Sequence, residues 1–288
     1  MSNAMWSCDW PAPAKVNLFL HVTGRRTDGR HNLQTLYQFL DYCDGLSFRV
    51  RADGEIRRRF GAEGVAEDDD LAVRAARGLQ ALTGTSAGAD IAITKRLPSG
   101  GGVGGGSSDA ATTLLALNHL WGTGLYLRQL AELALQLGAD VPVFVHGHAA
   151  WGEGLGEQLT AAEPRETWFL VIVPPVSVAT ADVFEAPELT RDCPPITMHD
   201  FLSRGASNVC EGPVRHRYPA VAEALEWLAA HGTTPRLSGT GACVFGAFAE
   251  ESAARAARAA LPRAWRGFVA RGRNRSPLAA RLGALGGR

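Results

Sequence analysis

The chain has 288 residues, of which 46% are hydrophobic and 20% are charged, and this composition excludes disorder along its whole length. Its 29 basic and 29 acidic residues balance, which argues against a nucleic-acid partner, and no apolar run reaches the ~18 residues of a membrane-spanning helix. The five cysteines form no Cys-x-x-Cys pair, so we expect no disulfide framework, no zinc site and a cytoplasmic location. The first four residues are interpreted as a leftover of recombinant expression.

The first half of the chain alternates between strand and helix patterns. An acidic run, Glu67 to Asp70, predicts a helix start with Asp70 as N-cap, because carboxylates favour the positive end of a helix. Asp140 follows a predicted helix that stops at Gly138, and it precedes an apolar stretch that reads as a strand. The predicted strands cover residues 14–22, 33–40, 46–51 and 91–95, and the predicted helices cover residues 71–82, a stretch opening at 107–108, and 127–137.

The second half has a different order of elements. Strand, helix, strand, strand, helix, strand is the order of a ferredoxin-like domain, interrupted here by a proline-rich excursion over residues 174–207. We therefore predict an α+β fold with two domains, residues 5–160 and residues 161–288. The elements predicted in the second domain cover residues 168–173, 220–230, 236–237, 243–248, 250–261 and 268–270.

A loop rich in glycine separates the strand that ends at Lys95 from the next helix. Six glycines occupy seven positions, 100–106, and glycine permits both positive φ and the close approach of backbone to a ligand. A helix N-terminus offers unpaired N–H groups, so the pattern predicts an anion cradle, with phosphate as its occupant. The alternative is a flexible linker, which the proline before the loop and the patterned helix after it disfavour.

Other phosphate-binding loops fit less well. A Walker A loop needs a lysine before its Ser or Thr, and none precedes Ser107. A Gly-x-Gly-x-x-Gly pattern is almost automatic in such a run, and residues 118–131 lack the acidic partner of a dinucleotide site. The signatures of protein kinases are absent from the sequence. Lysine is also rare: Lys15 and Lys95 stand against 27 arginines, and both lie beside these motifs.

Three segments resemble the motifs of the GHMP kinases: residues 13–18 (Pro-Ala-Lys-Val-Asn-Leu), residues 98–108, and residues 237–243 (Leu-Ser-Gly-Thr-Gly-Ala-Cys). The resemblance implies an N-terminal α+β domain followed by a ferredoxin-like domain. It also implies transfer of a phosphoryl group from ATP, with Mg²⁺, to the hydroxyl of a small molecule. The sequence leaves the protein ligand of the metal open, and we expect a monomer or a weak homodimer.

Further residues narrow the resemblance within the family. Asp28-Gly29, His31 and residues 138–142 match the member that acts on the 2-hydroxyl of a cytidine diphosphate-linked methylerythritol, in non-mevalonate isoprenoid precursor synthesis. Arg30 departs from that pattern, which has a tyrosine there to stack on the cytosine, although a guanidinium can stack as well. The alternatives are a kinase of the homoserine or mevalonate type and a sensor that binds ATP without turnover.

The resemblance assigns roles residue by residue. Asp140 becomes the base for the acceptor hydroxyl and Lys15 the cation between that base and the transferred phosphate; otherwise they read as a turn residue and a solvated strand lysine. Ser107 is also a candidate N-cap, and the glycines at 239–241 also fit a simple turn. The expected ATP-binding residues are Pro98, Ser99, Gly100, Gly101, Gly102, Val103, Gly104, Gly105, Gly106, Ser107 and Ser108. The expected substrate-binding residues are Asn17, His31, Thr180, Phe184, Gly239 and Thr240.

Overall fold

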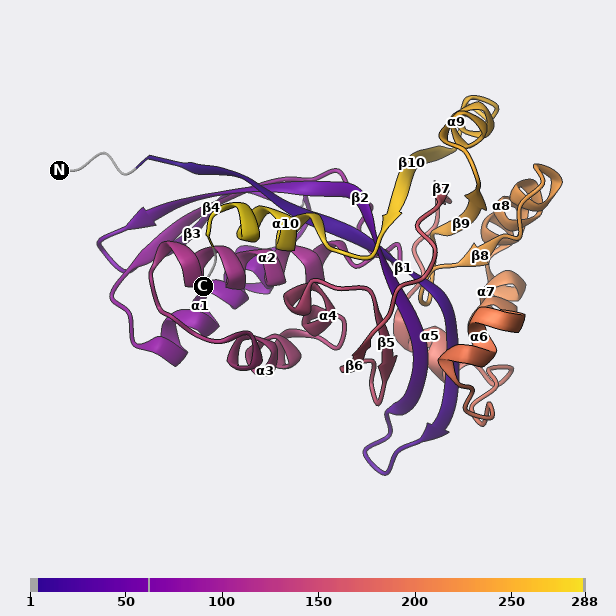
Figure 1. Ribbon diagram of the computed structural model, residues 1–288, viewed down its shortest axis with the longest axis horizontal. Helices are drawn as coiled ribbons and strands as arrows, with labels where there is room; N and C mark the ends of the chain where they lie inside the picture. The colour runs from indigo at the N-terminus through magenta and orange to yellow at the C-terminus, as the bar shows by residue number, and fades with distance from the viewer. Residues whose placement is uncertain (1–4, 62, 287–288) are drawn as a thin grey trace.

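The computed structural model describes residues 5–61 and 63–286, so the four residues interpreted as an expression leftover lie outside it. One continuous sheet runs through the molecule and joins its two halves (Figure 1). The path of the sheet is β3-β4-β2-β10-β7-β9-β8, with β1 and β5 also pairing with β2, and β6 with β5. Within this described part of the chain, no helix is long and apolar enough to cross a membrane.

The first half is built on a long antiparallel hairpin. Its strands are β1 (Ser7–Arg25) and β2 (His31–Arg51), and β2 covers both of the strands predicted there. The pairing continues between them, since Cys43, Asp44 and Gly45 lie opposite residues 11–13 of β1. The carboxylate of buried Asp44 accepts hydrogen bonds from the backbone N–H groups of Arg96 and Leu97. The shorter strands of this half are β3 (Ile56–Phe60), β4 (Gly88–Thr94), β5 (Ala150–Glu153) and β6 (Gln158–Ala161).

Helices pack against this part of the sheet and enclose the larger core, which includes Trp10, Phe48 and Phe144. Asp70 caps the first helix as predicted, since its side chain accepts a hydrogen bond from the backbone of Ala72. A short 3₁₀ helix (Glu67–Asp69) precedes it. The helices are α1 (Leu71–Thr83), α2 (Gly105–Leu120), α3 (Leu127–Leu137) and α4 (Val141–His146).

Two expectations in this half were wrong. Helix α2 begins at Gly105 with Gly104 as its N-cap, so Ser107 lies inside the first turn and is not the cap. The apolar stretch after Asp140 is helix α4 and not a strand. Its five buried residues show no periodicity that separates a short buried helix from a buried strand, and Pro142 fits the first turn of a helix.

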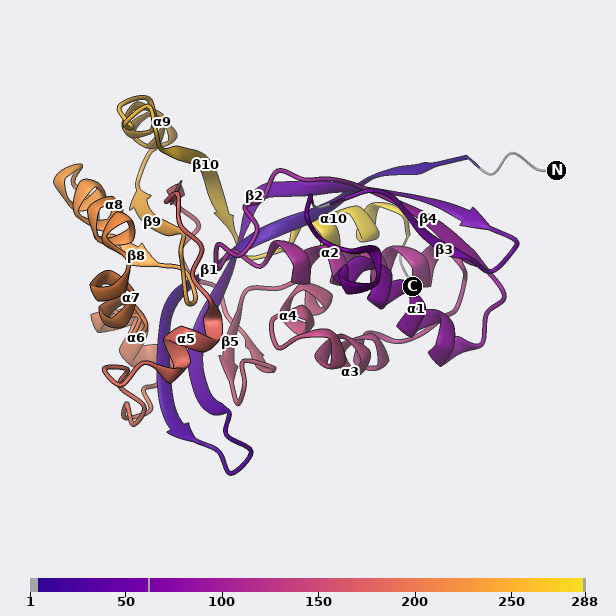
Figure 2. The same cartoon turned by 180° about the vertical axis from the view of Figure 1, so that it is seen from behind.

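The second half has the predicted ferredoxin-like order, and its four strands lie in the order β10-β7-β9-β8. Figure 2 shows its helices gathered at the end of the molecule away from α1 and α3. The proline-rich excursion over residues 174–207 folds into α5 (Thr180–Glu185) and α6 (Met198–Arg204), and α7 (Glu211–Arg217) follows it. The remaining elements are β7 (Trp168–Val173), α8 (Pro219–Ala230), β8 (Arg236–Leu237), β9 (Val244–Phe248), α9 (Glu251–Ala259) and β10 (Arg266–Arg273).

The last helix returns to the first half. Helix α10 (Pro277–Ala284) packs along β1, and Leu278 is buried in the larger core. Strand β10 pairs with β7 on one side and with β2 on the other. The division of the chain near residue 160 stays a prediction, and the two halves share both a sheet and a core.

Candidate active site

Close backbone contacts explain the glycines of the loop. Gly102 has φ +73°, and a Cβ there would lie 2.1 Å from the backbone oxygen of Ser238. Gly104 has φ +77°, and a Cβ there would lie 2.7 Å from the ring of Phe144. A side chain at either position would therefore collide and strain the backbone. Part of the glycine pattern serves the packing of the loop itself, in addition to leaving room for a ligand.

The third glycine segment packs directly against the first. Ser238 donates a hydrogen bond from its hydroxyl to the carbonyl of Gly102 (2.9 Å), and the N–H of Cys243 donates to the carbonyl of Gly101 (3.1 Å). The hydroxyls of Thr240 and Thr180 lie 3.0 Å apart. The turn at residues 239–241 thus joins the two halves at the glycine loop. It also lines a cavity beside the N-terminus of α2.

A cavity of about 440 Å³ opens beside the N-terminus of α2. It brings together residues from both halves of the chain and from all three motifs. Four of the predicted residues do not line it: Val103 and Ser108 are buried, Ser99 lies outside, and His31 lines a neighbouring cavity. The predicted residues that do line it are Lys15, Asn17, Pro98, Gly100, Gly101, Gly102, Gly104, Gly105, Gly106, Ser107, Asp140, Thr180, Phe184, Gly239 and Thr240.

An ion pair stands at the wall of this cavity. The Nζ of Lys15 lies 3.1 Å from Oδ2 of Asp140, and it donates a hydrogen bond to Oδ1 of Asn17 at 2.5 Å. Lys15 is almost fully buried, whereas 35% of the Asp140 side chain is exposed. Both residues line the cavity, and the carboxylate is the more accessible of the two.

Tyr37 is a site residue that sequence reasoning missed. Its hydroxyl donates a hydrogen bond to Oδ1 of Asp140 (3.2 Å), and burial together with the charge of Asp140 raises the pKa of Tyr37 well above its ordinary value. Tyr37 lies opposite Asn17 in the pairing of β2 with β1. The register of the hairpin is therefore what brings Tyr37 beside the predicted Lys15–Asp140 pair, and knowing that register would have identified Tyr37 as a site residue.

A chain of hydrogen bonds fixes Asn17 behind the pair. The amide of Asn17 donates to the hydroxyl of Thr35 (2.8 Å), and Thr35 donates to the carbonyl of Phe19 (2.6 Å). This chain leaves the amide oxygen of Asn17 directed at the ammonium of Lys15. Lys15 and Asn17 therefore lie on one face of the strand, and Thr35 is a further supporting residue.

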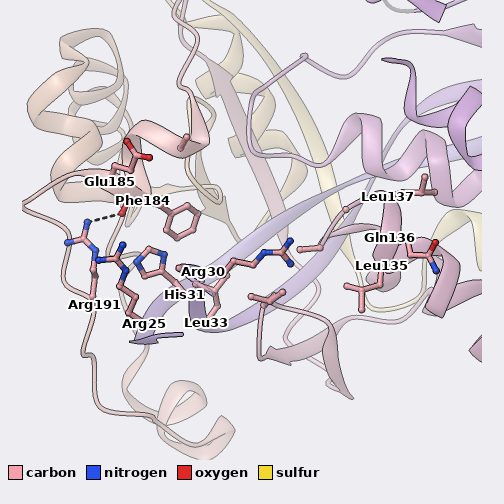
Figure 3. A pocket seen from close by; sticks show the side chains of 15 residues that line it. Arg25, Arg30, His31, Leu33, Leu135, Gln136, Leu137, Phe184, Glu185 and Arg191 are labelled. Carbon is pink, nitrogen blue, oxygen red and sulfur yellow. Dashed lines mark hydrogen bonds between the residues drawn. The ribbon is translucent and has the colours of Figure 1, made fainter. Parts of the chain in front are cut away.

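Figure 3 shows a second cavity, of about 780 Å³. It adjoins the first, since Leu33 and Phe184 line both. The rings of His31 and Phe184 stack at 5.3 Å between centroids and 16° between planes. Burial, then the charges of Arg191 and Arg25, lower the pKa of His31. The ring nitrogen Nε2 of His31 is buried and has no hydrogen-bond partner among the described residues.

Two arginines of this second cavity play different parts. Arg191 donates hydrogen bonds to the carbonyls of Phe184 and Ala186, both at 2.7 Å, and so holds the end of α5 in place. Arg30 extends away from His31 and Phe184, across the opening toward residues 135–137 at the end of α3 (Figure 3). The cavity therefore combines an aromatic wall with a cation at its opening.

Comparison with known proteins gives matches along nearly the whole chain. Two family models match, that of the N-terminal domain of GHMP kinases over residues 70–148 and that of their C-terminal domain over residues 197–267. The chain is 59% identical to the 4-diphosphocytidyl-2-C-methyl-D-erythritol kinase of Halorhodospira halophila, with 95% of both chains covered. It is 58% identical to the kinase of that name from Alkalilimnicola ehrlichii, with 96% of this chain and 95% of that one covered.

Solved structures agree with these matches. A crystal structure of 4-(cytidine 5'-diphospho)-2C-methyl-D-erythritol kinase superposes with a TM-score of 0.79 at 35% identity, covering 93% of this chain and 99% of that one. Homoserine kinase from Cytophaga hutchinsonii superposes with a TM-score of 0.65 at 16% identity, covering 96% of both chains, and shows a similar fold.

Proposed function

The chain belongs to the GHMP kinase family, and from this premise we propose that it transfers the γ-phosphoryl group of ATP to the 2-hydroxyl of 4-diphosphocytidyl-2-C-methyl-D-erythritol. The observation that carries the proposal is the Lys15–Asp140 pair at the wall of a cavity into which the glycine loop opens. The names of relatives that are 59% and 58% identical support the choice of acceptor. The adjoining cavity, with its stacked His31 and Phe184, offers room for the base of that acceptor.

Asp140 acts as the base for the acceptor hydroxyl. Tyr37 holds one carboxylate oxygen and Lys15 approaches the other, so the carboxylate is oriented before the substrate arrives. Its exposed part faces the cavity, where the hydroxyl proton has to be accepted. The remaining capacity of the carboxylate oxygens for hydrogen bonds is available for that proton.

Lys15 stabilises the negative charge that develops on the transferred group. Its ammonium is almost fully buried, so its field is screened less than in water, and Asn17 fixes its position. Phosphoryl transfer depends mainly on positioning and charge stabilisation, which is what a fixed cation beside an oriented base supplies.

The N-terminus of α2 binds the phosphates of ATP. The first N–H groups of a helix lack partners within the helix, and they point here toward the cavity beside the glycine loop. Among the residues that the structure describes, no group of three or more His, Cys, Asp or Glu side chains could hold a metal ion. Mg²⁺ would enter with the nucleotide as MgATP, carried by the phosphates, whose charge it neutralises.

The acceptor extends from Asp140 into the second cavity. Phe184 offers a ring face to the cytosine, and His31, which lines the same cavity, is the proposed hydrogen-bond partner of its edge. Arg30 replaces a tyrosine of the family pattern, and its guanidinium lies across the opening of this cavity, directed away from His31 and Phe184 (Figure 3). We further propose a cytoplasmic location, which the five free cysteines support, and no nucleic-acid partner, which the balanced charge supports. We also propose a monomer or weak homodimer.

Release of ADP from the purified chain tests the proposal. MgATP is incubated with diphosphocytidyl-methylerythritol, and parallel reactions contain homoserine or mevalonate. We expect turnover with the cytidine compound alone. Turnover only with homoserine or mevalonate would contradict the proposed acceptor while leaving the kinase chemistry in place, and ATP binding without turnover would indicate a sensor.

A further inference from the structure

The second lysine of the chain lies in a buried cluster behind the glycine loop. The Nζ of Lys95 donates a hydrogen bond to Oδ2 of Asp109 at 2.7 Å and a second one to Oδ2 of Asp44. Both aspartate side chains are almost fully buried, and 19% of the Lys95 side chain is exposed. Neither carboxylate reaches the cavity of the proposed reaction, so the cluster has no direct part in the chemistry.

The cluster ties together the segments that present the cradle. Asp44 belongs to β2, Lys95 follows β4, and Asp109 lies in the second turn of α2. A Cβ on Gly105, the first residue of α2, would lie 3.5 Å from Nζ of Lys95 and 3.8 Å from Oδ2 of Asp44. The charges of the cluster therefore lie directly behind the helix end that faces the nucleotide phosphates.

The charges of the cluster do not balance. Asp44 satisfies its second oxygen with two backbone N–H groups, but Oδ1 of Asp109 is buried without a hydrogen-bond partner among the described residues. An ionised carboxylate with an unpaired buried oxygen is costly, and the neutral form is less so. The charged groups acting on Asp109 are Lys95, Asp44, and Asp70 at the N-cap of α1, which is itself paired with Arg58.

Burial, with the nearby Asp44 adding to it and Lys95 opposing it, raises the pKa of Asp109 to about 7. The cluster of Asp44, Lys95 and Asp109 thus carries one net negative charge when Asp109 is ionised and none when it is protonated. Near neutral pH both forms are populated. The helix end that receives the phosphates is backed by either a negative or a neutral cluster.

We propose that Asp109, held by Lys95, is a positioning residue whose charge sets the affinity of the α2 N-terminus for the nucleotide's phosphates. This inference rests on the proposed function for the identity of the nucleotide. A proton on Asp109 removes negative charge from behind the cradle and so strengthens nucleotide binding. By linkage, a bound nucleotide strengthens the hold of Asp109 on its proton.

The test compares the wild type with Asp109→Asn, which keeps the shape of the side chain and removes its charge. The dissociation constant of the MgATP analogue adenylyl-imidodiphosphate is measured by calorimetry between pH 5.5 and pH 8.5. The ionisation of the analogue itself cancels in the ratio of the two constants. We expect a ratio of wild type to variant near one at the acid end, rising to about fivefold at the alkaline end, as for a screened charge nearby.

Two results would overturn the proposal: a ratio that does not change with pH, or weaker binding by Asp109→Asn at every pH. Either result would mean that the cluster holds the three segments together but does not affect nucleotide affinity through its charge. Asp53→Asn is the matched control, because it removes a carboxylate paired with a single cation, Arg51, at the surface, and it should give a flat ratio. Turnover of the acceptor is not measured, so failure of the proposed acceptor cannot be mistaken for failure of this inference.

A second measurement needs only the wild type, in case Asp109→Asn fails to fold. Calorimetry of analogue binding near pH 7.5, in two buffers with different ionisation enthalpies, reports the protons taken up on binding. We expect proton uptake once the protons that the analogue itself releases are subtracted, and its absence would contradict the proposal. Lys95→Met provides a further check: without the ammonium the carboxyl of Asp109 keeps its proton to higher pH, so uptake near pH 7.5 should be lost.

Discussion

The chain places its two lysines in two aspartate sites on either side of the glycine loop, and the two sites differ in access. At the Lys15 site the carboxylate of Asp140 opens to the cavity, with 35% of its side chain exposed. At the Lys95 site both carboxylates are almost fully buried. Similar ion-pair chemistry therefore serves two ends: the open pair can exchange a proton with a substrate, and the closed cluster can only act on its surroundings through charge.

The hydrogen-bond partners of the two lysine sites also differ, in whether they carry charge. Asn17 and Tyr37 complete the hydrogen bonds of the open pair with neutral groups. The closed cluster uses a second carboxylate, Asp44, which also anchors the backbone of Arg96 and Leu97. On the proposed roles, neutral partners leave the carboxylate of Asp140 free to act as a base, whereas a second carboxylate beside Lys95 and Asp109 makes the charge of the cluster depend on protonation.

Asp140→Asn should have the largest effect on turnover. The variant keeps the shape of the side chain but cannot accept the hydroxyl proton, and general-base assistance is worth about 10²–10⁴ in rate. We expect kcat to fall at least ~10²-fold, measured by ADP release, with an unchanged thermal melting curve. Turnover close to that of the wild type would contradict the view that the Lys15 site, unlike the Lys95 site, takes part in the reaction.

Lys15→Ala should lower kcat by at least ~10² as well, because it removes the buried ammonium that stabilises the transferred phosphoryl group. The dissociation constant of the acceptor, measured separately, distinguishes this loss from weaker binding. Circular dichroism serves as the folding control. If kcat survived and only acceptor affinity fell, Lys15 would be a binding residue and not a catalytic one.

Asp109→Asn should change the pH dependence of stability. The pKa of Asp109 is about 7 in the folded protein against an ordinary 3.8, so the folded chain keeps a proton that the unfolded chain loses. The stability that this proton contributes is complete below about pH 4 and is lost as pH rises through 7. Between pH 5 and pH 8 the wild type should lose about 2–3 kcal/mol more than the variant.

Urea unfolding at the two pH values measures that difference. The same experiment on Asp53→Asn gives the control, since that surface carboxylate pairs with Arg51 and its pKa is lowered by this pairing. Equal pH dependence in the wild type and Asp109→Asn would show that Asp109 is ionised throughout, and the closed cluster would then carry a constant charge.

Tyr37→Phe should have the smallest of these effects. It removes the hydroxyl that donates to Oδ1 of Asp140, and one hydrogen bond to a charged group corresponds to about tenfold in kcat. The dissociation constant of the ATP analogue should stay within about twofold of the wild type, because Tyr37 contacts the base and not the glycine loop. A larger loss of nucleotide affinity than of kcat would show that Tyr37 supports nucleotide binding and not Asp140.

The sequence alone identified the motifs of the site but not the residues that hold the motif side chains in place. Hydrophobic periodicity located α3 and β7 with their observed ends, and the glycine run together with Asp140 marked the site. Hydrophobic periodicity did not identify helix α4, because a short run of buried apolar residues has no period that separates helix from strand. Tyr37 and Asp44 lie far from the motifs in sequence and reach them only through the register of β2, which a single sequence does not reveal.

Single-turnover transfer of the γ-phosphoryl group at saturating nucleotide and acceptor compares the two lysines most directly. Lys15→Met should slow the transfer step at least ~10²-fold, because it removes charge at the reacting group. Lys95→Met should leave that step within about threefold of the wild type, because saturation compensates for a change in nucleotide affinity. Equal slowing of the transfer step in both variants would contradict the account.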